Sequence, residues 1–321
     1  MVSVIIPIYN GEKYIDRCLG SVLFGISDND DIEVIAVNDG SRDASSEILH
    51  GYEKKHSALR VIDKENGGAG SARRAGLLAA RGEYVAFLDV DDYVEPGMYK
   101  KLEDKAKSSG ADIVFCGYVE ETEKQSRAVK NLLRKGQELL MDGASAVGYI
   151  HSRRAVFPFP WNKIYRKTLI DRIGFPDGSF IGEDYYMLLQ LLSMTDKVDI
   201  LDEELYHYVI TENSVSRSGY GKVTEVSYLH FKESREYVKS KFLESLSEAD
   251  NYYTTEFLSF IVAMGRNKTY NKEMIREIKA FVSKNLWNYV SSDSVPLVMK
   301  GSAVAFCINY RLLILGYKII K

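Results

Sequence analysis

Three carboxylates stand close together at Asp89, Asp91 and Asp92, directly after an apolar run. That run, residues 83–88, is typical of a buried strand. Clustered carboxylates repel one another unless a cation neutralises them. Hard oxygen ligands suit Mg²⁺ or Mn²⁺, and such an ion commonly bridges protein carboxylates and substrate phosphates. The alternative is a solvated acidic turn before a helix that begins near Pro96. The other motifs of the chain distinguish between a metal site and a solvated turn.

Apolar strand-like runs alternate with helix-like stretches over the first 118 residues. This alternation predicts an α/β fold with a parallel sheet that helices cover on both faces. In such a sheet, ligands bind beyond the carboxyl ends of the strands. The expected strands are residues 2–8, 32–37, 59–62, 84–88 and 113–118, and the expected helices are residues 11–24, 43–55, 69–81 and 96–108.

Small or polar residues follow each of the first three expected strands, at residues 9–11, 38–43 and 66–73. Each turn leads into a helix N-terminus, which suits phosphate oxygens. A turn followed by a helix cap accounts for the residue types next to Asp39 but accounts less well for Asp39 itself. Asp39 could instead accept hydrogen bonds from a base edge or a ribose. Arg73 stands one turn into its helix, where it could reach a diphosphate or remain a surface charge.

The glycines in these turns match neither of two common nucleotide-binding motifs. Residues 66–73 do not contain G-x-x-x-x-G-K-[ST], which argues against a P-loop NTPase. The first strand does not lead into G-x-G-x-x-G, which argues against the usual dinucleotide fold.

Four blocks of sequence resemble the signature segments of family 2 glycosyltransferases. They are residues 4–10, 37–43, 66–73 and 87–92. The resemblance covers residues 1–118 strongly and residues 155–217 in part. It implies a GT-A fold, which is Rossmann-like with a mostly parallel central sheet flanked by helices, here with a C-terminal helical extension. It also implies a bacterial enzyme of the capsular or exopolysaccharide type.

The resemblance further implies a nucleotide-sugar donor, usually UDP-linked, and Mn²⁺ or Mg²⁺ as the cofactor. Asp89 and Asp91 match the family's D-x-D motif, with Asp91 nearest the metal. The residues that would bind the donor are Pro7, Tyr9 and Asp39, which line the base and ribose pocket, together with Asn10, Gly67, Arg73, Asp89 and Arg217. Two positions depart from the family pattern: Asn38 stands where a second Asp is frequent, and Arg74 where Asn is frequent.

An acidic pair, Glu183 and Asp184, precedes a helix expected at residues 184–193. The pair resembles the family's catalytic carboxylates. Asp184 would then be the general base that takes the acceptor hydroxyl proton, and Glu183 would orient it or touch the acceptor. Two nearby carboxylates can also raise one pKa, which suits a base working near neutrality. The alternative is that the pair complements the dipole at a helix N-terminus.

Residues 205–217 resemble a closing segment of bacterial members. His207 would approach the metal or the diphosphate, and Arg217 would contact the diphosphate once a loop closes. An ordinary strand histidine is an equal alternative for His207. Trp161 could stack on an acceptor ring or anchor the core. The Q-x-x-R-W motif of processive synthases does not follow the acidic pair, which predicts transfer of one sugar at a time.

Composition narrows the partners and the compartment. A net charge of -3 over 321 residues gives no reason to expect nucleic-acid binding. The three cysteines have no metal-type spacing, which fits a reducing compartment. We find no stretch of about 18 uncharged apolar residues and so expect no transmembrane helix. These features predict a cytoplasmic protein.

Beyond about residue 220 the sequence becomes charged and helical. We therefore predict a catalytic domain at residues 1–220 and a helical region at residues 221–321. The catalytic domain would divide into a nucleotide-binding half, residues 1–118, and an acceptor half, residues 119–220. The tail interleaves cations with apolar residues and Tyr, which suits an interfacial helix on anionic lipid at the inner face of the plasma membrane. Packing on the catalytic domain is the alternative.

The leading hypothesis is an inverting, metal-assisted glycosyltransferase that transfers a hexosyl or N-acetylhexosaminyl group in cell-surface polysaccharide synthesis. Its acceptor would be a glycan or a polyprenyl-diphosphate-linked saccharide. A nucleotidyltransferase is one alternative, but it needs a basic glycine-rich loop after the first strand, and residues 9–12 lack those cations. A sugar-nucleotide-binding module without catalysis is the other, and the intact acidic residues speak against it.

Overall fold

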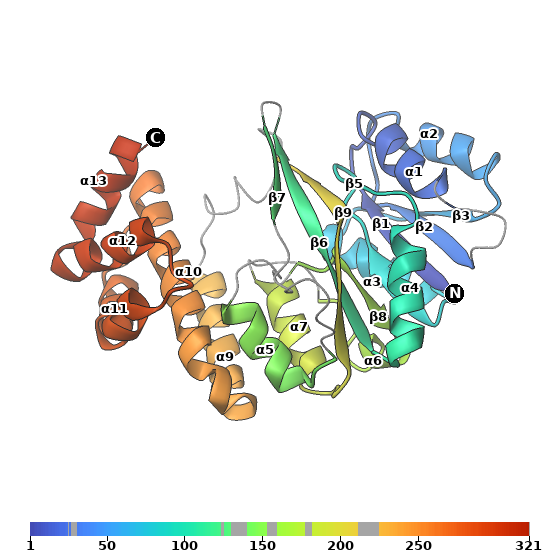
Figure 1. Cartoon of the computed structure of the whole chain (residues 1–321). Coiled ribbons are helices and arrows are strands. Elements are labelled where there is room, and N and C mark those ends of the chain that lie inside the picture. Colours follow the sequence, from blue (N-terminus) through green and yellow to red (C-terminus); the bar gives the residue numbers. More distant parts are fainter. Residues whose placement is uncertain are drawn as a thin grey trace. The chain divides into compact units, whose positions relative to one another are not determined.

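The computed structural model describes residues 1–24, 26, 31–122, 125–129, 140–152, 159–176, 182–210 and 225–320 (Figure 1). The chain divides into two compact units. The first comprises Met1–Ala146, Ala155–Ser179 and Glu183–Thr211, and the second comprises Val147–Arg154, Phe180–Gly182 and Glu212–Lys321. The predicted domain boundary near residue 220 lies outside the described residues and stays a prediction.

In the described residues, the first unit is built on one mixed sheet of nine strands. Four N-terminal strands run parallel, as the alternating sequence pattern predicts, and their order is β3-β2-β1-β4. They are β1 (Val2–Ile8), β2 (Ile32–Asn38), β3 (Leu59–Asp63) and β4 (Tyr84–Phe87). All seven residues of β1 are buried, because this strand lies between two neighbours and is covered on both faces.

The sheet continues beyond β4 through strands of mixed direction, in the order β8-β6-β9-β5. These strands are β8 (Lys163–Arg166), β6 (Ile113–Thr122), β9 (Val198–Val209) and β5 (Tyr93–Val94), while β7 (Gln125–Val129) pairs with β6. The strand β8 is antiparallel to both β4 and β6, and β9 is parallel to β6. The short strand β5 follows the acidic cluster directly and pairs with the end of β9.

Helices lie between these strands in the sequence. They are α1 (Ile15–Leu23), α2 (Ser45–Glu53), α3 (Ala69–Ala79), α4 (Met98–Ser109), α5 (Gly143–Ser152), α6 (Lys167–Ile170) and α7 (Glu183–Leu192). Gly76 allows α3 to lie against β1, because a Cβ atom at this position would come within 2.3 Å of Cγ2 of Ile5. The helix α4 ends at Gly110, whose φ of 72° suits glycine.

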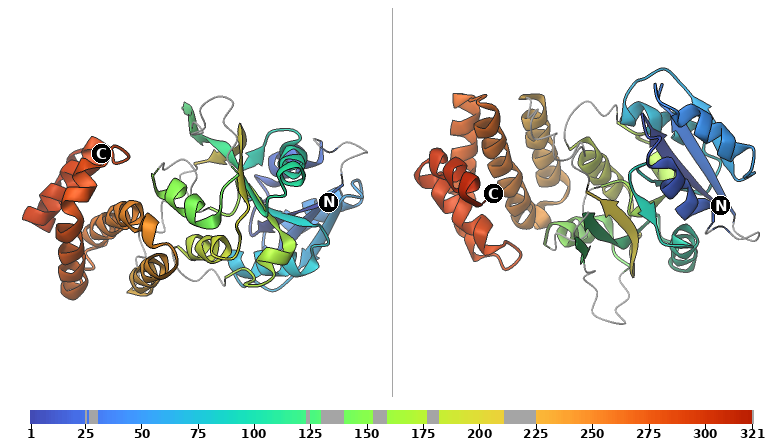
Figure 2. Two further views of the ribbon diagram at one scale, coloured as in Figure 1. Left: turned by 60° about the horizontal axis from the view of Figure 1, so that its bottom comes forward. Right: turned by 90° about the horizontal axis from the view of Figure 1, so that it is seen from above.

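The described part of the second unit beyond residue 224 consists of helices and their connections (Figure 2). They are α9 (Glu225–Lys241), η2 (Leu243–Ser245), α10 (Leu246–Asn267), α11 (Lys272–Ser291), α12 (Leu297–Ile308) and α13 (Tyr310–Ile320). Aromatic side chains such as Phe231, Tyr253 and Phe260 fill the core of this unit. Trp287 on α11 is 81% exposed. Among the described helices, none has the length and apolar character needed to cross a bilayer.

Candidate active site

Hydrogen bonds join the polar turns that follow β1 and β2. The peptide N–H groups of Asn10 and Gly11 donate to the hydroxyls of Ser41 (3.0 Å) and Ser45 (2.9 Å). In return, Oδ1 of Asn10 accepts from the N–H of Arg42 at 2.8 Å. Asn10 has a φ of 51°, a left-handed conformation that asparagine tolerates. Asn10, predicted to bind the donor, therefore fixes one turn against the next.

The carboxylate of Asp39 holds the glycine-rich loop in place. This side chain is buried and accepts hydrogen bonds from Nζ of Lys64 at 2.5 Å, the N–H of Gly67 at 3.0 Å and the N–H of Gly68 at 2.7 Å. Gly40 follows with a φ of 70°, and a Cβ atom there would come within 2.8 Å of the backbone nitrogen of Asn66. The loop and the Asp39 turn are thus one unit, with Asp39 at its centre.

The two other residues predicted to line the base and ribose pocket lie differently. Tyr9 is 46% exposed directly beyond the end of β1. Pro7 is buried within β1, in register with Val37 of β2. The Tyr9 ring is therefore accessible to a ligand, whereas Pro7 shapes the strand beneath it.

Each of the three clustered carboxylates has a different environment. Asp89 is an ion-pair partner of Arg73, with 2.5 Å between Oδ1 and Nη2. Burial, and then the charge of Asp89, raises the pKa of Asp91 to about 6. Asp92 is fully buried and accepts hydrogen bonds from the Tyr206 hydroxyl at 2.6 Å and the Val209 N–H at 2.8 Å. Asp92 therefore attaches β9 to this turn, which leaves Asp89 and Asp91 as the pair available to a ligand.

Arg73 links this cluster to the acidic pair at the start of α7. Burial lowers the pKa of Arg73, but the negative charges of Asp89, Asp184 and Glu183 outweigh it, and the pKa is raised. Burial also raises the pKa of Asp184, while Arg73 is the largest opposing influence. One cation thus interacts with both groups of carboxylates that the sequence assigned to metal binding and to base catalysis. Arg73 also lies over the ring of Phe175, 5.2 Å from its centroid.

Lys163 is a buried cation beside this pair that was not among the predicted site residues. Its ammonium donates to Oδ1 of Asn162 at 2.5 Å and to the carbonyl of Phe159, and it lies 4.9 Å from the ring centre of Phe115. Burial lowers the pKa of Lys163 to about 7, while the negative charge of Asp184 acts in the opposite direction. The sequence feature that could have indicated this buried cation is a lysine that stands among aromatic residues at the start of a strand.

Trp161 is part of the core. Only 2% of it is exposed, and its ring stacks on Tyr206 at 4.2 Å and on Phe159 at 5.0 Å. Of the two roles considered for Trp161, the structure shows the core anchor.

His207 contacts acidic residues outside the D-x-D motif. Its Nε2 lies 2.9 Å from Oε1 of Glu95, its Nδ1 lies 3.0 Å from Oε1 of Glu121, and its ring stacks on Tyr93 at 4.2 Å. Among the described residues, no group of three or more His, Cys, Asp or Glu side chains could hold a metal ion. The assignment of His207 to a metal stays a prediction. Arg217 lies outside the described residues.

Comparison with known proteins identifies the family. The model of the family described as Glycosyl transferase family 2 matches residues 3–179, which is more than half of the chain. The chain belongs to glycosyltransferase family 2. The four blocks that suggested this family all lie within the matched region. Three of them include the carboxyl end of β1, β2 or β4, and the fourth begins three residues after β3.

Relatives in this family come from several bacteria. The uncharacterized glycosyltransferase EpsJ of Bacillus subtilis is 35% identical over 68% of this chain and 64% of its own length. The glycosyltransferase GlyA of Streptococcus pneumoniae is 32% identical over 67% of this chain and 31% of its own length. The matches thus span less than two thirds of either relative.

Solved structures of other glycosyltransferases share the fold. Staphylococcus aureus TarS 1-349 in complex with UDP-GlcNAc has a TM-score of 0.65 and 22% identity, covering 100% of this chain and 92% of that one. The mannosyltransferase PcManGT of Pyrobaculum calidifontis, in complex with GDP-Man and Mn²⁺, has a TM-score of 0.58 and 14% identity over 98% of this chain and 86% of that one. These likenesses confirm the predicted GT-A fold of this family 2 member.

Proposed function

We propose that this chain is an inverting glycosyltransferase that moves one sugar at a time from a UDP-sugar to a glycan or a polyprenyl-diphosphate-linked acceptor. The observation that carries the proposal is the position of Arg73, which interacts with Asp89 and also with the acidic pair at the start of α7. A donor-binding cluster and a buried carboxylate base thus belong to one site. The UDP-GlcNAc complex of the structurally similar TarS supports the donor class.

The residues at the acidic turn fit a hard divalent cation such as Mn²⁺ or Mg²⁺. Asp89 and Asp91 offer carboxylate oxygens. Burial, and then the charge of Asp89, raises the pKa of Asp91, and a bound cation would oppose both effects. Two carboxylates leave positions for donor phosphates and water, as such ions prefer. When bound, the ion would offset the negative charge that develops on the departing nucleotide.

Asp184 would remove the proton from the acceptor hydroxyl as that oxygen attacks the anomeric carbon of the donor sugar. The new bond forms on the face opposite the nucleotide, the bond from carbon to diphosphate oxygen breaks, and the configuration inverts. Burial raises the pKa of Asp184, which makes it a stronger base than an exposed carboxylate, while the charge of Arg73 opposes that rise. Glu183 stands beside it, where it would orient the base or the acceptor.

On the donor side, Asp39 fixes the loop whose small residues approach the diphosphate. Gly67 and Gly68 direct their N–H groups at Asp39, and the helix α3 begins at the next residue. The exposed ring of Tyr9 would cover the base. This arrangement presents a helix N-terminus and Arg73 to the anionic part of the donor.

Release of UDP from a panel of UDP-sugars in the presence of Mn²⁺ tests the proposal. We expect release from one donor, and we expect Asp91→Ala to abolish it and Asp184→Asn to reduce it by at least about 100-fold, the usual contribution of a general base. Release that neither substitution alters would refute this placement of the site. Tight UDP binding without consumption of any donor, with an acceptor mixture present, would instead indicate a binding module.

A further inference from the structure

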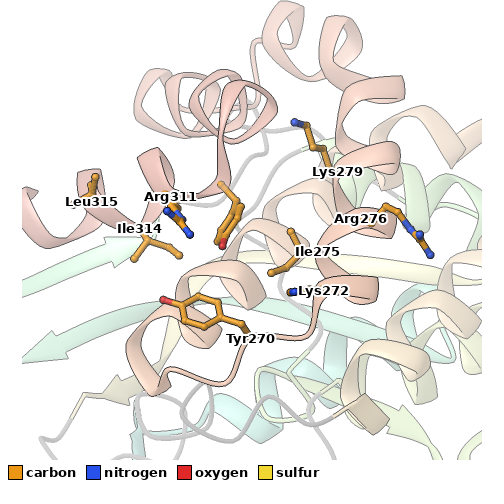
Figure 3. Close-up of a pocket in the computed structure, with 9 residues that line it drawn as sticks. Tyr270, Lys272, Ile275, Arg276, Lys279, Arg311, Ile314 and Leu315 are labelled. Atoms are coloured by element: carbon orange, nitrogen blue, oxygen red, sulfur yellow. The ribbon is translucent and has the colours of Figure 1, made fainter.

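A cavity of about 870 Å³ lies in the second unit, lined by residues of α11 and α13 and of the connection before α11 (Figure 3). Among the nine described residues that line it, four are cationic: Lys272, Arg276, Lys279 and Arg311. In Figure 3, Lys272 and Ile275 of α11 face Arg311 and Ile314 of α13. The cavity therefore combines cations with apolar walls, and the function proposed above does not use it.

Ile314 of α13, which lines this cavity, also packs closely on α10. A Cβ atom at Gly265 of α10 would come within 2.8 Å of three side-chain atoms of Ile314, so glycine is what permits this approach. Two tyrosines close the cavity between the helices, with the rings of Tyr270 and Tyr310 6.2 Å apart, and Arg311 lies 5.9 Å from the ring centre of Tyr310. The cavity is thus built by tertiary packing.

The charge of this region is opposite to that of the whole protein. Residues 297–320, which form α12, α13 and their connection, contain Lys300, Arg311 and Lys318 and no Asp or Glu, although the chain carries a net charge of -3. On α11, the Glu273 carboxylate lies 3.8 Å from Arg276, and Glu277 is engaged by Lys232 and Tyr228. A cationic surface remains, and it suits an anionic ligand.

Apolar side chains project from the same helices. Five of them are between 44% and 84% exposed: Leu297, Val298, Ile308, Leu312 and Leu315. Leu315 also lines the cavity. Apolar side chains with interspersed cations are the composition of helices that lie in the interface of an anionic bilayer.

We propose that this face, formed by α11, α12 and α13, docks on an anionic lipid bilayer, with a headgroup phosphate in the cavity. The cations hold the phosphate, and the apolar residues enter the boundary between headgroups and acyl chains. A second copy of the chain fits less well, because two such faces would bring like charges together. This inference goes beyond the proposed function and stands independently of it.

Flotation of the full-length chain with lipid vesicles tests the proposal. One set contains phosphatidylcholine alone, and the other contains equal parts of phosphatidylcholine and phosphatidylglycerol. The cavity variant replaces three exposed cations, and the control variant replaces three exposed lysines elsewhere with the same change in charge. The cavity variant is Lys272→Gln, Arg276→Gln and Arg311→Gln, and the control is Lys54→Gln, Lys55→Gln and Lys241→Gln.

We expect the chain to float with the anionic vesicles only, and added salt to weaken this binding. The cavity variant should bind roughly 100-fold less tightly, since each cation near an anionic surface contributes about fivefold. The control variant should bind nearly as the natural chain does. The double substitution Ile308→Ser and Leu312→Ser should also weaken binding to the anionic vesicles. Soluble glycerophosphate should compete only poorly with the vesicles for the natural chain.

Three outcomes would overturn the proposal. The first is the absence of flotation with anionic vesicles, and the second is equal loss in the cavity and control variants. The third is a dimer in solution that only the cavity variant disrupts, which would assign the face to a second copy. Circular dichroism of each variant separates a binding defect from loss of fold.

Discussion

Arg73 is the residue through which the two halves of the proposed site interact. Its guanidinium pairs with Asp89 at 2.5 Å and opposes the effect of burial on Asp184. A base has to be deprotonated to act, so the acidic limb of the pH profile of kcat/KM follows its pKa. From the sequence, Arg73 was either a contact for a diphosphate or a surface charge. Its interaction with Asp184 depends on the position of the N-terminus of α7 in the folded chain.

Arg73→Ala should therefore shift the acidic limb of that profile to higher pH. Loss of the positive charge removes the largest influence that lowers the pKa of Asp184, while burial remains. We also expect a loss of at least about tenfold in kcat/KM at neutral pH, by the same argument. Arg74→Ala is the matched control, because Nε of this neighbouring arginine donates to the carbonyl of Phe175. An unshifted profile for Arg73→Ala would contradict the assignment.

Asp91 should make the stability of the metal-free protein depend on pH. Its pKa is about 6 in the folded chain against an ordinary value of 3.8, so the unfolded chain loses this proton first as the pH rises. Folding therefore loses stability between about pH 4 and 6, and the loss persists at pH 7. Asp91→Asn should melt at a higher temperature than the natural chain at pH 7, with a smaller difference near pH 4.

Added Mn²⁺ should raise the melting temperature of the natural chain at pH 7 but not that of Asp91→Asn, because binding to the folded state alone stabilises it. The same substitution at the exposed Asp104 of α4 serves as the control. A difference between Asp91→Asn and the natural chain that does not change with pH would show that burial of this carboxylate has been misread.

Residue types and spacing located the carboxylates but could not reveal their internal partners. Asp39 was predicted to meet a base or ribose, and its oxygens accept hydrogen bonds from Lys64, Gly67 and Gly68. Asp92 belongs to the acidic cluster in sequence, but its carboxylate accepts hydrogen bonds from Tyr206 and Val209 of β9. These bonds join residues 25 to 117 positions apart, a distance at which sequence patterns carry no information.

The helix α3 acts as an element that positions Arg73. Gly76 stands one turn after Arg73, and its lack of a Cβ atom sets the distance from α3 to Ile5 of β1. The alternation of strands and helices predicted this helix. The pattern did not show that one glycine determines how closely it approaches the sheet, because contact between a helix and a sheet depends on both sequences.

Gly76→Ala should destabilise the protein by about 1–3 kcal/mol, because the added methyl group overpacks a buried contact. It should also reduce transfer activity, since the displaced helix carries Arg73. Gly51→Ala in α2 is the control: no other described residue lies within 4 Å of a Cβ atom placed there. That change should stabilise by about 0.4–1 kcal/mol. Urea unfolding measures both, and equal effects would rule out the packing argument.

Strand order was predictable for the parallel half of the sheet and not for the rest. Short connections with one helix each make neighbours of β1, β2 and β3. The antiparallel strand β8 lies between β4 and β6 although forty residues, 123–162, separate it from β6 in sequence. The predicted strand at residues 113–118 also extends to Thr122, because its end forms a hairpin with β7.

At the scale of the whole molecule, the sequence distinguished a sheet-forming part from a helical part. It could not show that residues 147–152 cluster with the helical unit, because they precede the acidic pair in the chain. Nor could it show the cavity beside α13, which requires the close approach at Gly265. Amphipathic patterns indicate that a helix has an apolar face, but they do not indicate which neighbour covers it.

The two tryptophans should respond differently to a soluble quencher. Trp161, in the sheet unit, is 2% exposed, and Trp287, in the helical unit, is 81% exposed. Iodide should therefore quench the emission of Trp161→Phe strongly, because Trp287 remains, and that of Trp287→Phe only weakly. Similar quenching of the two variants would contradict the burial of Trp161.

Each compact unit thus contains its own intrinsic fluorophore. A blue, shielded emission reports on the aromatic stack beneath the proposed active site, and a red, quenchable emission reports on the surface of α11. A titration of the unlabelled natural chain with a nucleotide or with lipid can therefore show, from the wavelength that changes, which of the two units the ligand reaches.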